Sequence, residues 1–158
     1  MNKLSSGGGQ RIRGILLWLF VINLGIAFGA GLYEGKVVVS NWAGTSPILW
    51  PNTGIEFWAF VTTGPLTLLT IANAIAAWKT TGPRRSWYLA AVGLIIIERA
   101  ATFGYFIPTM VGLLGNESLS QAEVDATLAQ WAAWNYVRHA LNFAGWLSAL
   151  KALQKSHS

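Results

Sequence analysis

Apolar residues dominate two long uncharged stretches of the chain. Residues 14–33 carry no charge and a single amide, Asn23, and residues 57–78 carry no charge. About 20 helical residues are needed to cross a hydrocarbon core roughly 30 Å thick, so either stretch is long enough. Two further stretches, near 86–107 and 127–150, are of similar length but contain internal charges. The pattern predicts four transmembrane helices, at about 14–36, 56–79, 85–107 and 122–153.

The first apolar stretch has a second interpretation, as a cleavable signal peptide. Basic residues precede it and small residues follow it, as in a secretory leader. Its apolar run is long for such a leader, however, and we therefore prefer a helix that stays in the protein.

The basic residues lie on one side of the predicted bundle. They occur before the first helix, between the second and third, and after the fourth: Lys3, Arg11, Arg13, Lys79, Arg84, Arg85, Lys151 and Lys155. On the opposite side the only basic residue is Lys36. The positive-inside rule then places both termini in the cytoplasm.

These observations together predict an all-α, integral membrane four-helix bundle with both termini cytoplasmic. We expect a flexible N-terminal tail at 1–13, a single transmembrane domain at 14–153 and a C-terminal tail at 154–158. The uncharged loop between the first two helices, about 37–55, is predicted to be a cap or a re-entrant segment that rests on the mouth of the bundle.

Composition excludes several classes of protein. Hydrophobic residues make up 53% of the chain and charged residues only 11%, whereas soluble domains carry about 25% charged residues. The chain has no cysteine, which excludes disulfides, thiol chemistry and cysteine-bound metals. The net charge of +5 sits at segment ends, which favours membrane lipids as partners over nucleic acid. We find no phosphate-binding loop, nucleophile elbow or nucleic-acid module.

Small residues recur in the first helix at the spacing that allows close helix packing. Gly25 and Gly29 form one such pair, and Gly31 and Gly35 form another. Packing within the chain is the preferred explanation. A seam between two copies uses the same spacing, so a homo-oligomer is retained as a partner.

Polar residues inside the predicted helices fall on one face of each helix. In the last helix Trp131, Asn135, Arg138 and Asn142 are spaced four, three and four residues apart, which puts them on one face. Glu98, Thr102 and Tyr105 follow the same spacing in the third helix, and Glu34 ends a stripe in the first. Ionisable groups in a membrane cost several kcal/mol and usually face the bundle interior.

Depth along the helices predicts which charges meet. Glu98 and Arg138 lie equally far from the cytoplasmic ends of their helices, so we expect an intramembrane Glu98–Arg138 pair. Arg99 points about 100° away from Glu98 and is expected to meet Glu34 or Glu56. Such pairs often only fix helix register, and that alternative is retained. The number of polar groups favours a polar pocket with aromatic walls that opens outward.

Within this pocket we assign two sets of residues. Glu98, Arg138 and Asn135 are the candidate catalytic residues. The candidate ligand-binding residues are Trp131, Glu34, Arg99, Tyr105, His139 and Asn142. Trp134 flanks the polar stripe and is expected to stack on a guest with Trp131, while the tryptophans near helix ends are interpreted as interfacial anchors. We expect no metal and no cofactor; a metal bound by His139 with Glu34, Glu56 or Glu98 is the weaker alternative.

The stretch WAAWNYVRHALNF (131–143) also carries a family resemblance. Its pattern W-x-x-x-N-x-x-R, at Trp131, Asn135 and Arg138, resembles the anthrone-oxygenase-like family of small four-helix membrane proteins. The segments GLYEGKVV (31–38) and ERAATFGYFIP (98–108) resemble stretches of small bacterial membrane proteins of this kind, and the likeness covers most of 14–152. The resemblance implies a bacterial inner membrane location. It also implies oxidation of anthrone-like compounds without metal or flavin, with Asn135 and Arg138 orienting the substrate.

Three functions are compatible with this sequence. The first is a cofactor-independent oxygenase-like enzyme acting on an apolar aromatic or quinol-like compound. In it a carboxylate (Glu98 or Glu34) or His139 removes a proton, and Arg138 with Asn135 stabilises the anion. The second is a non-catalytic membrane binder or carrier of a lipid-like or small ligand. The third is a scaffold or assembly protein whose polar core only fixes helix packing.

Overall fold

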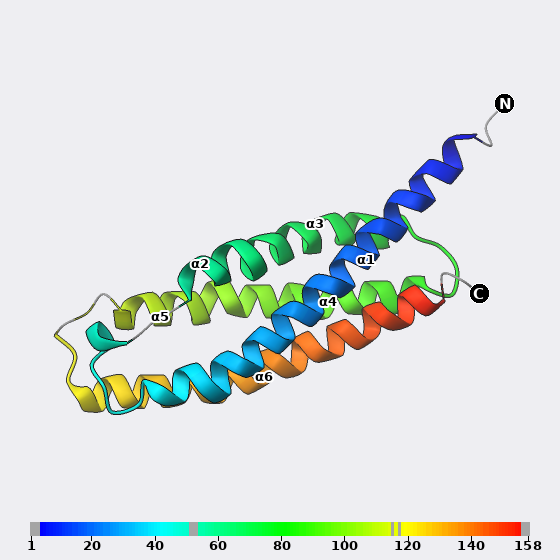
Figure 1. The fold of residues 1–158 in the computed structure, drawn as a ribbon. Coiled ribbons are helices and arrows are strands. Elements are labelled where there is room, and N and C mark those ends of the chain that lie inside the picture. The colour runs from blue at the N-terminus through cyan, green and yellow to red at the C-terminus, as the bar shows by residue number, and fades with distance from the viewer. Residues whose placement is uncertain (1–3, 51–53, 115, 117, 156–158) are drawn as a thin grey trace.

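The computed structural model describes residues 4–50, 54–114, 116 and 118–155, and within these ranges it is all-helical (Figure 1). The α-helices in chain order are α1 (Leu4–Tyr33), α2 (Ile55–Phe57), α3 (Gly64–Trp78), α4 (Arg85–Ala101), α5 (Ile107–Leu114) and α6 (Gln121–Gln154). Three π-helical segments, η1 (Glu34–Val38), η4 (Trp58–Thr63) and η5 (Thr102–Phe106), extend α1, join α2 to α3 and join α4 to α5. The chain therefore forms four long helical segments, as the hydrophobic pattern predicts.

The boundaries of these segments differ from the predicted ones mainly at two ends. α1 begins at Leu4, so residues 4–13 are helical where a flexible tail was expected. The third segment continues through α5 to Leu114 instead of ending near 107. Extending an existing helix adds one hydrogen bond per residue without a new nucleation step, which explains why both helices run past the apolar stretches. Residues 1–3 and 156–158 lie outside the described residues.

The four segments pack in a closed ring. α1 contacts α3, α3 contacts α4, α4 contacts α6, and α6 returns to α1. Figure 1 shows both termini and the link between α3 and α4 at one end of the bundle, with the N-terminal turns of α1 projecting beyond it. α5, the loop after α1 and the start of α6 lie at the opposite end, which we call the loop end.

Three of the four segments are long and apolar enough to cross a membrane: 8–41, 55–78 and 85–114. α6 is the longest helix, with 34 residues, but it is not among them. It carries Glu123, Asp125, Arg138 and Lys151, which lower its apolar character. The prediction of transmembrane helices is therefore supported by length and composition for three segments.

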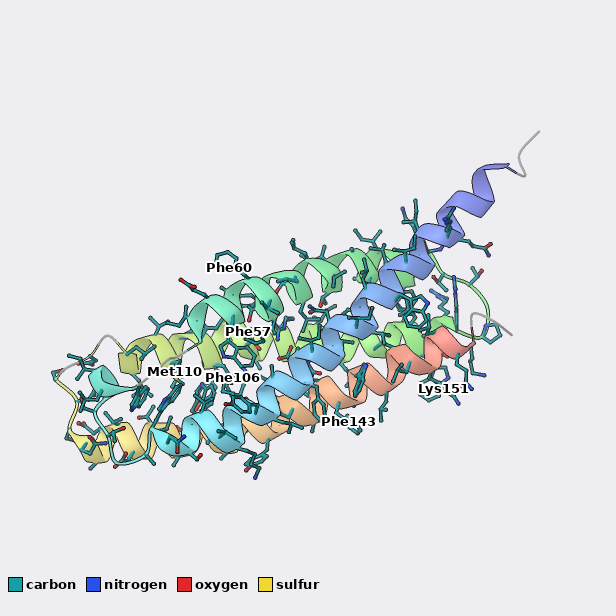
Figure 2. The ribbon with its side chains drawn as sticks, in the orientation of Figure 1. Phe57, Phe60, Phe106, Met110, Phe143 and Lys151 are labelled. Carbon is teal, nitrogen blue, oxygen red and sulfur yellow. The ribbon has the colours of Figure 1, made fainter. Side chains whose placement is uncertain are left out.

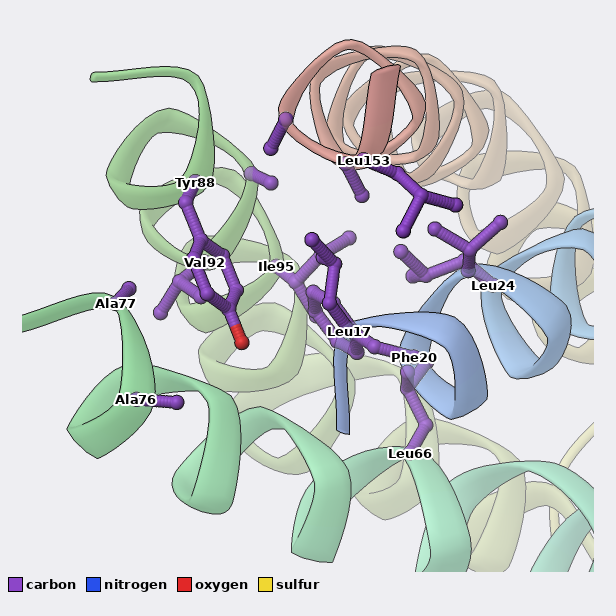
Figure 3. Packing of buried hydrophobic residues seen from close by; sticks show 14 of the residues in the cluster. Leu17, Phe20, Leu24, Leu66, Ala76, Ala77, Tyr88, Val92, Ile95 and Leu153 are labelled. Carbon is purple, nitrogen blue, oxygen red and sulfur yellow. The ribbon is translucent and has the colours of Figure 1, made fainter. Parts of the chain in front are cut away.

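The apolar core at the end near the termini is tightly packed. Leu17, Phe20 and Leu24 of α1 are almost fully buried, and they pack with Leu66, Ile95 and Leu153 of the other three segments (Figure 3). The buried Tyr88 hydroxyl lies in this region and donates a hydrogen bond to Asn73 Oδ1. Tyr88 and Asn73 thus pair two buried polar side chains within this apolar half of the bundle.

The π-helical segment η4 is explained by the Gly64–Pro65 pair that follows it. Pro65 has no N–H to donate to the Val61 carbonyl four residues earlier, and the Asn23 amide of α1 donates to that carbonyl at 3.2 Å. A Cβ on Gly64 would lie 2.7 Å from the Ala59 carbonyl oxygen, so the tight turn requires glycine. Asn23 thus ties α1 to the irregular part of the neighbouring segment.

Glycines of α1 allow close approach to α6. A Cβ on Gly31 would overlap the His139 ring, and one on Gly25 would lie 3.2 Å from Trp146. Around Gly29 there is open space. At Gly25 and Gly31 the small residues therefore serve packing within the chain, which is the preferred of the two explanations offered by the sequence.

The start of α6 is fixed by a capping box. The Ser120 backbone N–H donates to Glu123 Oε2 at 2.9 Å, and the Glu123 N–H donates to Ser120 Oγ at 3.4 Å. The Ser120 hydroxyl also donates to Glu123 Oε2 at 2.7 Å. This bond is the main cause that holds the pKa of Glu123 below its ordinary value, and the bond from the Ser120 backbone N–H adds to it. Two helix N–H groups that would otherwise lack partners are satisfied here.

Candidate functional site

A cavity of about 260 Å³ lies in the loop-end half of the bundle. We call it the inner cavity. Its lining includes one residue or more from each π-helical segment: Glu34 of η1, Trp58 of η4 and Phe106 of η5. π-helical turns are rare and occur often at functional sites, because the extra residue re-aims neighbouring side chains. The three π-helical segments in the described part of the chain thus contribute to one cavity.

The walls of the inner cavity combine aromatic and aliphatic side chains. The Trp131 indole packs edge to face on Phe106, with ring centroids 5.7 Å apart, and its Nε1 donates to the Phe106 carbonyl at 3.1 Å. Trp42 completes this wall from the loop after α1 and stacks on Trp50 at 4.7 Å. Figure 2 shows Phe57, Phe106 and Met110 gathered toward the loop end. The loop tryptophans are buried, which supports the prediction that this loop caps the bundle.

A single ion pair supplies the charge of the inner cavity. Arg138 Nη2 lies 3.6 Å from Glu34 Oε2, and the two side chains are 12% and 11% exposed. The Arg138 guanidinium also lies 4.6 Å from the Phe106 ring centroid and 5.7 Å from that of Trp131, where cation–π attraction holds it. The cavity therefore presents one anchored cation and one carboxylate against apolar walls.

The predicted Glu98–Arg138 pair is wrong, because Glu98 is held by its neighbour in sequence. Arg99 binds it in a bidentate manner, with Nε–Oε2 at 2.6 Å and Nη2–Oε1 at 2.7 Å. The Thr102 hydroxyl adds a hydrogen bond to Oε1 at 3.1 Å. Adjacent helical residues point apart, but the long arginine side chain folds back to its neighbour. Arg99 consequently meets neither Glu34 nor Glu56, and Glu98 is poorly placed to act as a base.

A small polar pocket lies behind the inner cavity. Its volume is about 20 Å³, and Arg138 lines both spaces. Glu98, Arg99, His139 and Asn142 also line it. Arg99 Nη1, His139 Nε2 and Asn142 Oδ1 are buried and have no hydrogen-bond partner among the described residues. The space suits about one water molecule, so these four predicted residues form a polar layer behind the cavity.

Asn135 does not join the predicted catalytic group. It is 2% exposed, and within the described chain neither its Nδ2 nor its Oδ1 has a partner. It lines a separate pocket of about 30 Å³ between α1 and α6, together with His139, Lys36 and Tyr136. Lys36 Nζ donates to the Tyr136 hydroxyl there at 3.0 Å. Of the predicted catalytic residues, only Arg138 lines the inner cavity.

Two further aromatic residues differ from expectation. Tyr105 lines none of these three pockets, and its buried hydroxyl has no partner in the described part of the chain. Trp134 is 53% exposed and cannot stack on a guest of the inner cavity beside Trp131. Trp134 is three residues beyond Trp131, and that spacing turns it by about 60° from the direction of Trp131.

Sequence reasoning missed several residues of the inner cavity. Trp58 was interpreted as an interfacial anchor, and Trp42, Phe106 and Met110 were not singled out, yet all four line it. The sequence offered one signal: Trp58 precedes Thr62 and Thr63, two polar residues in an apolar helix. No cluster of three or more His, Asp or Glu able to hold a metal occurs among the described residues.

No protein-family model matches this chain, and neither does a curated protein or a solved structure. The resemblance to the anthrone-oxygenase-like family therefore stays a prediction. The class of protein that the fold defines is an all-α four-helix bundle, and its function has to be argued from the cavity.

Proposed function

We propose that this chain is an integral membrane protein of the bacterial inner membrane that binds an apolar aromatic compound carrying one hydroxyl or oxo group. The bundle lies across the membrane with both termini in the cytoplasm, so the loop end faces outward. α6 lies with the three apolar segments and turns Arg138 toward them, while Glu123 and Lys151 lie exposed near its two ends. The asymmetry of basic residues supports this orientation.

One observation supports the ligand class: the inner cavity combines aromatic walls with a single Arg138–Glu34 pair. At about 260 Å³ it exceeds the roughly 150 Å³ apolar cavity that holds benzene. Flat ring systems pack against Trp131 and Phe106, and a ring oxygen reaches the Arg138 guanidinium. A charged or strongly polar ligand would leave most of its surface against apolar groups and is disfavoured.

Binding is tested with naphthol and naphthalene, which differ only in the hydroxyl. Quenching of tryptophan fluorescence reports binding to the purified protein in a fixed concentration of detergent. We expect naphthol to bind about tenfold to a hundredfold more tightly, as one hydrogen bond to a charged group provides. Arg138→Met removes this difference, while the control Trp134→Leu at an exposed position leaves it unchanged. Equal affinities for the two compounds in the unmodified protein would refute the proposal.

A cofactor-independent oxygenase is the second candidate, favoured by the placement of Glu34 and Arg138 in one cavity. Glu34 takes a proton from an acidic ring CH₂ group, and Arg138 stabilises the resulting enolate. Dioxygen, the co-reactant, then oxidises this carbon, so that CH₂ and O₂ become C=O and water. Glu34 takes the role of base here because Arg99 occupies both oxygens of Glu98.

Turnover of anthrone separates the enzyme from the binder. Oxygen uptake that is equimolar with anthraquinone formation is expected from the oxygenase, and Glu34→Gln lowers the rate by about a hundredfold or more. The Glu34→Gln variant should still bind naphthol, since Arg138 is retained. Binding without any oxygen uptake beyond the uncatalysed rate would leave the non-catalytic binder as the function.

A further inference from the structure

A second cavity adjoins the inner one and shares two of its residues. Its volume is about 420 Å³, and we call it the outer cavity. Glu34 and Trp58 line both cavities. The remaining lining residues are Ala30, Tyr33, Val38, Gly54 and Phe57. The Glu34 carboxylate and the Trp58 indole therefore form the junction between the two spaces.

The outer cavity lies between the end of α1 and the start of α2. Ala30 and Tyr33 belong to α1, and Phe57 belongs to α2. Figure 1 shows these two segments diverging toward the loop end. Tyr33 is 62% exposed and Phe57 is 42% exposed, so the outer cavity opens at the side of the bundle. In the proposed membrane orientation that side faces lipid.

The chemistry of the outer cavity differs from that of the inner one. Among the described residues its lining contains no basic side chain, and the only ionisable groups there are the Glu34 carboxylate at the junction and the Tyr33 hydroxyl. The rest of the lining is alkyl, aromatic or glycine. Such a space accommodates an uncharged apolar chain, whereas a phosphate or carboxylate would find no cation among its lining residues.

We propose that the outer cavity holds the apolar tail of the ligand whose ring head group fills the inner cavity. This inference rests on the proposed function and narrows its substrate class to a ring compound with a hydrocarbon chain. Because Glu34 stands at the junction and pairs with Arg138, the ring oxygen lies next to the point where the chain is attached. The chain then leaves the bundle between α1 and α2 toward the lipid.

The test compares naphthol with two geranyl-naphthols. One carries the chain on the ring carbon next to the hydroxyl, and the other carries it on the far side of the ring. Ala30→Phe fills the outer cavity from α1, and Val38→Phe fills it from η1 as an independent variant. Ile22→Phe is the matched control, because Ile22 is 52% exposed on the same helix and lines neither cavity. Isothermal titration calorimetry in nanodiscs gives each affinity.

We expect Ala30→Phe and Val38→Phe to weaken binding of the adjacent isomer by about tenfold or more, since the added ring and the chain cannot share the space. Binding of naphthol stays within about twofold in both variants, and Ile22→Phe changes neither affinity. In the unmodified protein the adjacent isomer binds more tightly than the distant one. A variant that binds naphthol normally is folded, which removes misfolding as an explanation.

Three results would overturn the inference. If the adjacent isomer binds equally well to Ala30→Phe and to the unmodified protein, the tail does not use the outer cavity. Equal affinities of the two isomers contradict the placement of the ring oxygen at Glu34. In both cases naphthol still binds and the proposed function stands. If naphthol itself does not bind, the proposed function fails and the inference fails with it.

Discussion

The pairing of Arg138 with Glu34 can be measured against the alternative pairing with Glu98. Glu34→Gln and Arg138→Met each remove one charge and keep most of the side-chain volume. Together with the double variant they form a thermodynamic cycle, which isolates the interaction between the two residues. A second cycle uses Glu98→Gln with Arg138→Met. The two cycles share one variant, so they compare two candidate partners of the same arginine.

The geometry gives the expected magnitudes. For unit charges 3.6 Å apart, Coulomb attraction is about 4 to 5 kcal/mol at an effective dielectric constant of about 20. Part of this offsets the desolvation of both groups, so we expect a coupling of about 1 to 3 kcal/mol. Arg138→Met alone leaves the Glu34 carboxylate without its partner and lowers the free energy of unfolding by about 3 kcal/mol. This is the lower end of the range for buried ion pairs, because both groups are partly exposed. The cycle with Glu98→Gln should give a coupling energy of less than about 1 kcal/mol, since Arg99 neutralises the Glu98 carboxylate.

The free energy of unfolding is measured by reversible denaturation of the purified protein in mixed micelles. Far-ultraviolet circular dichroism follows the loss of helix, and all variants are compared at one detergent composition. Glu34→Gln together with Arg138→Met should recover part of the stability that Arg138→Met loses. A Glu98 cycle with a coupling equal to or larger than that of the Glu34 cycle would refute the assignment of the pair.

Two further predictions concern helix packing and helix ends. Gly31→Ala should lower the unfolding temperature because its Cβ would overlap the His139 ring, with a loss of about 1 to 3 kcal/mol in the free energy of unfolding. The control Gly29→Ala faces open space and should be neutral or slightly stabilising. Equal losses for the two variants would contradict the close approach of α1 to α6 at Gly31. Ser120→Ala should cost about 1 kcal/mol at neutral pH through loss of the cap. The folded protein lowers the pKa of Glu123, so the carboxylate contribution to the cap is complete above pH 4.5 and is lost as the pH falls through the lowered pKa. The difference in stability between Ser120→Ala and the unmodified protein should therefore shrink in acid. A difference that grows in acid would argue against the capping box.

The fold could be predicted from the sequence to a large extent because each helix is specified locally. Uncharged runs of about 20 residues specify the long helices, and a serine followed three residues later by a glutamate marks the start of α6. The extension of α1 back to Leu4 was not predicted, since three consecutive glycines there disfavour a helix in isolation.

The candidate site could be predicted only in part. The face shared by Trp131 and Arg138 was correct, and both residues line the inner cavity. Glu34 was expected among the ligand-binding residues and lines this cavity as well. Helical spacing gives the direction of a side chain about its own axis, but it does not give the rotation of one helix against another. The partner of Arg138 and the location of Asn135 depend on that rotation.

The sequence by itself determined which residues are helical, where most helices begin and end, and which polar groups each helix carries. The tertiary structure decided which of those groups meet. Three π-helical turns, at 34–38, 58–63 and 102–106, each insert an extra residue per turn and rotate everything beyond them. No hydrophobic repeat in the sequence records such a turn. In the packed bundle Arg138 pairs with Glu34, and Arg99 holds Glu98, so Glu34 and Trp58 line the inner cavity and Glu98 does not.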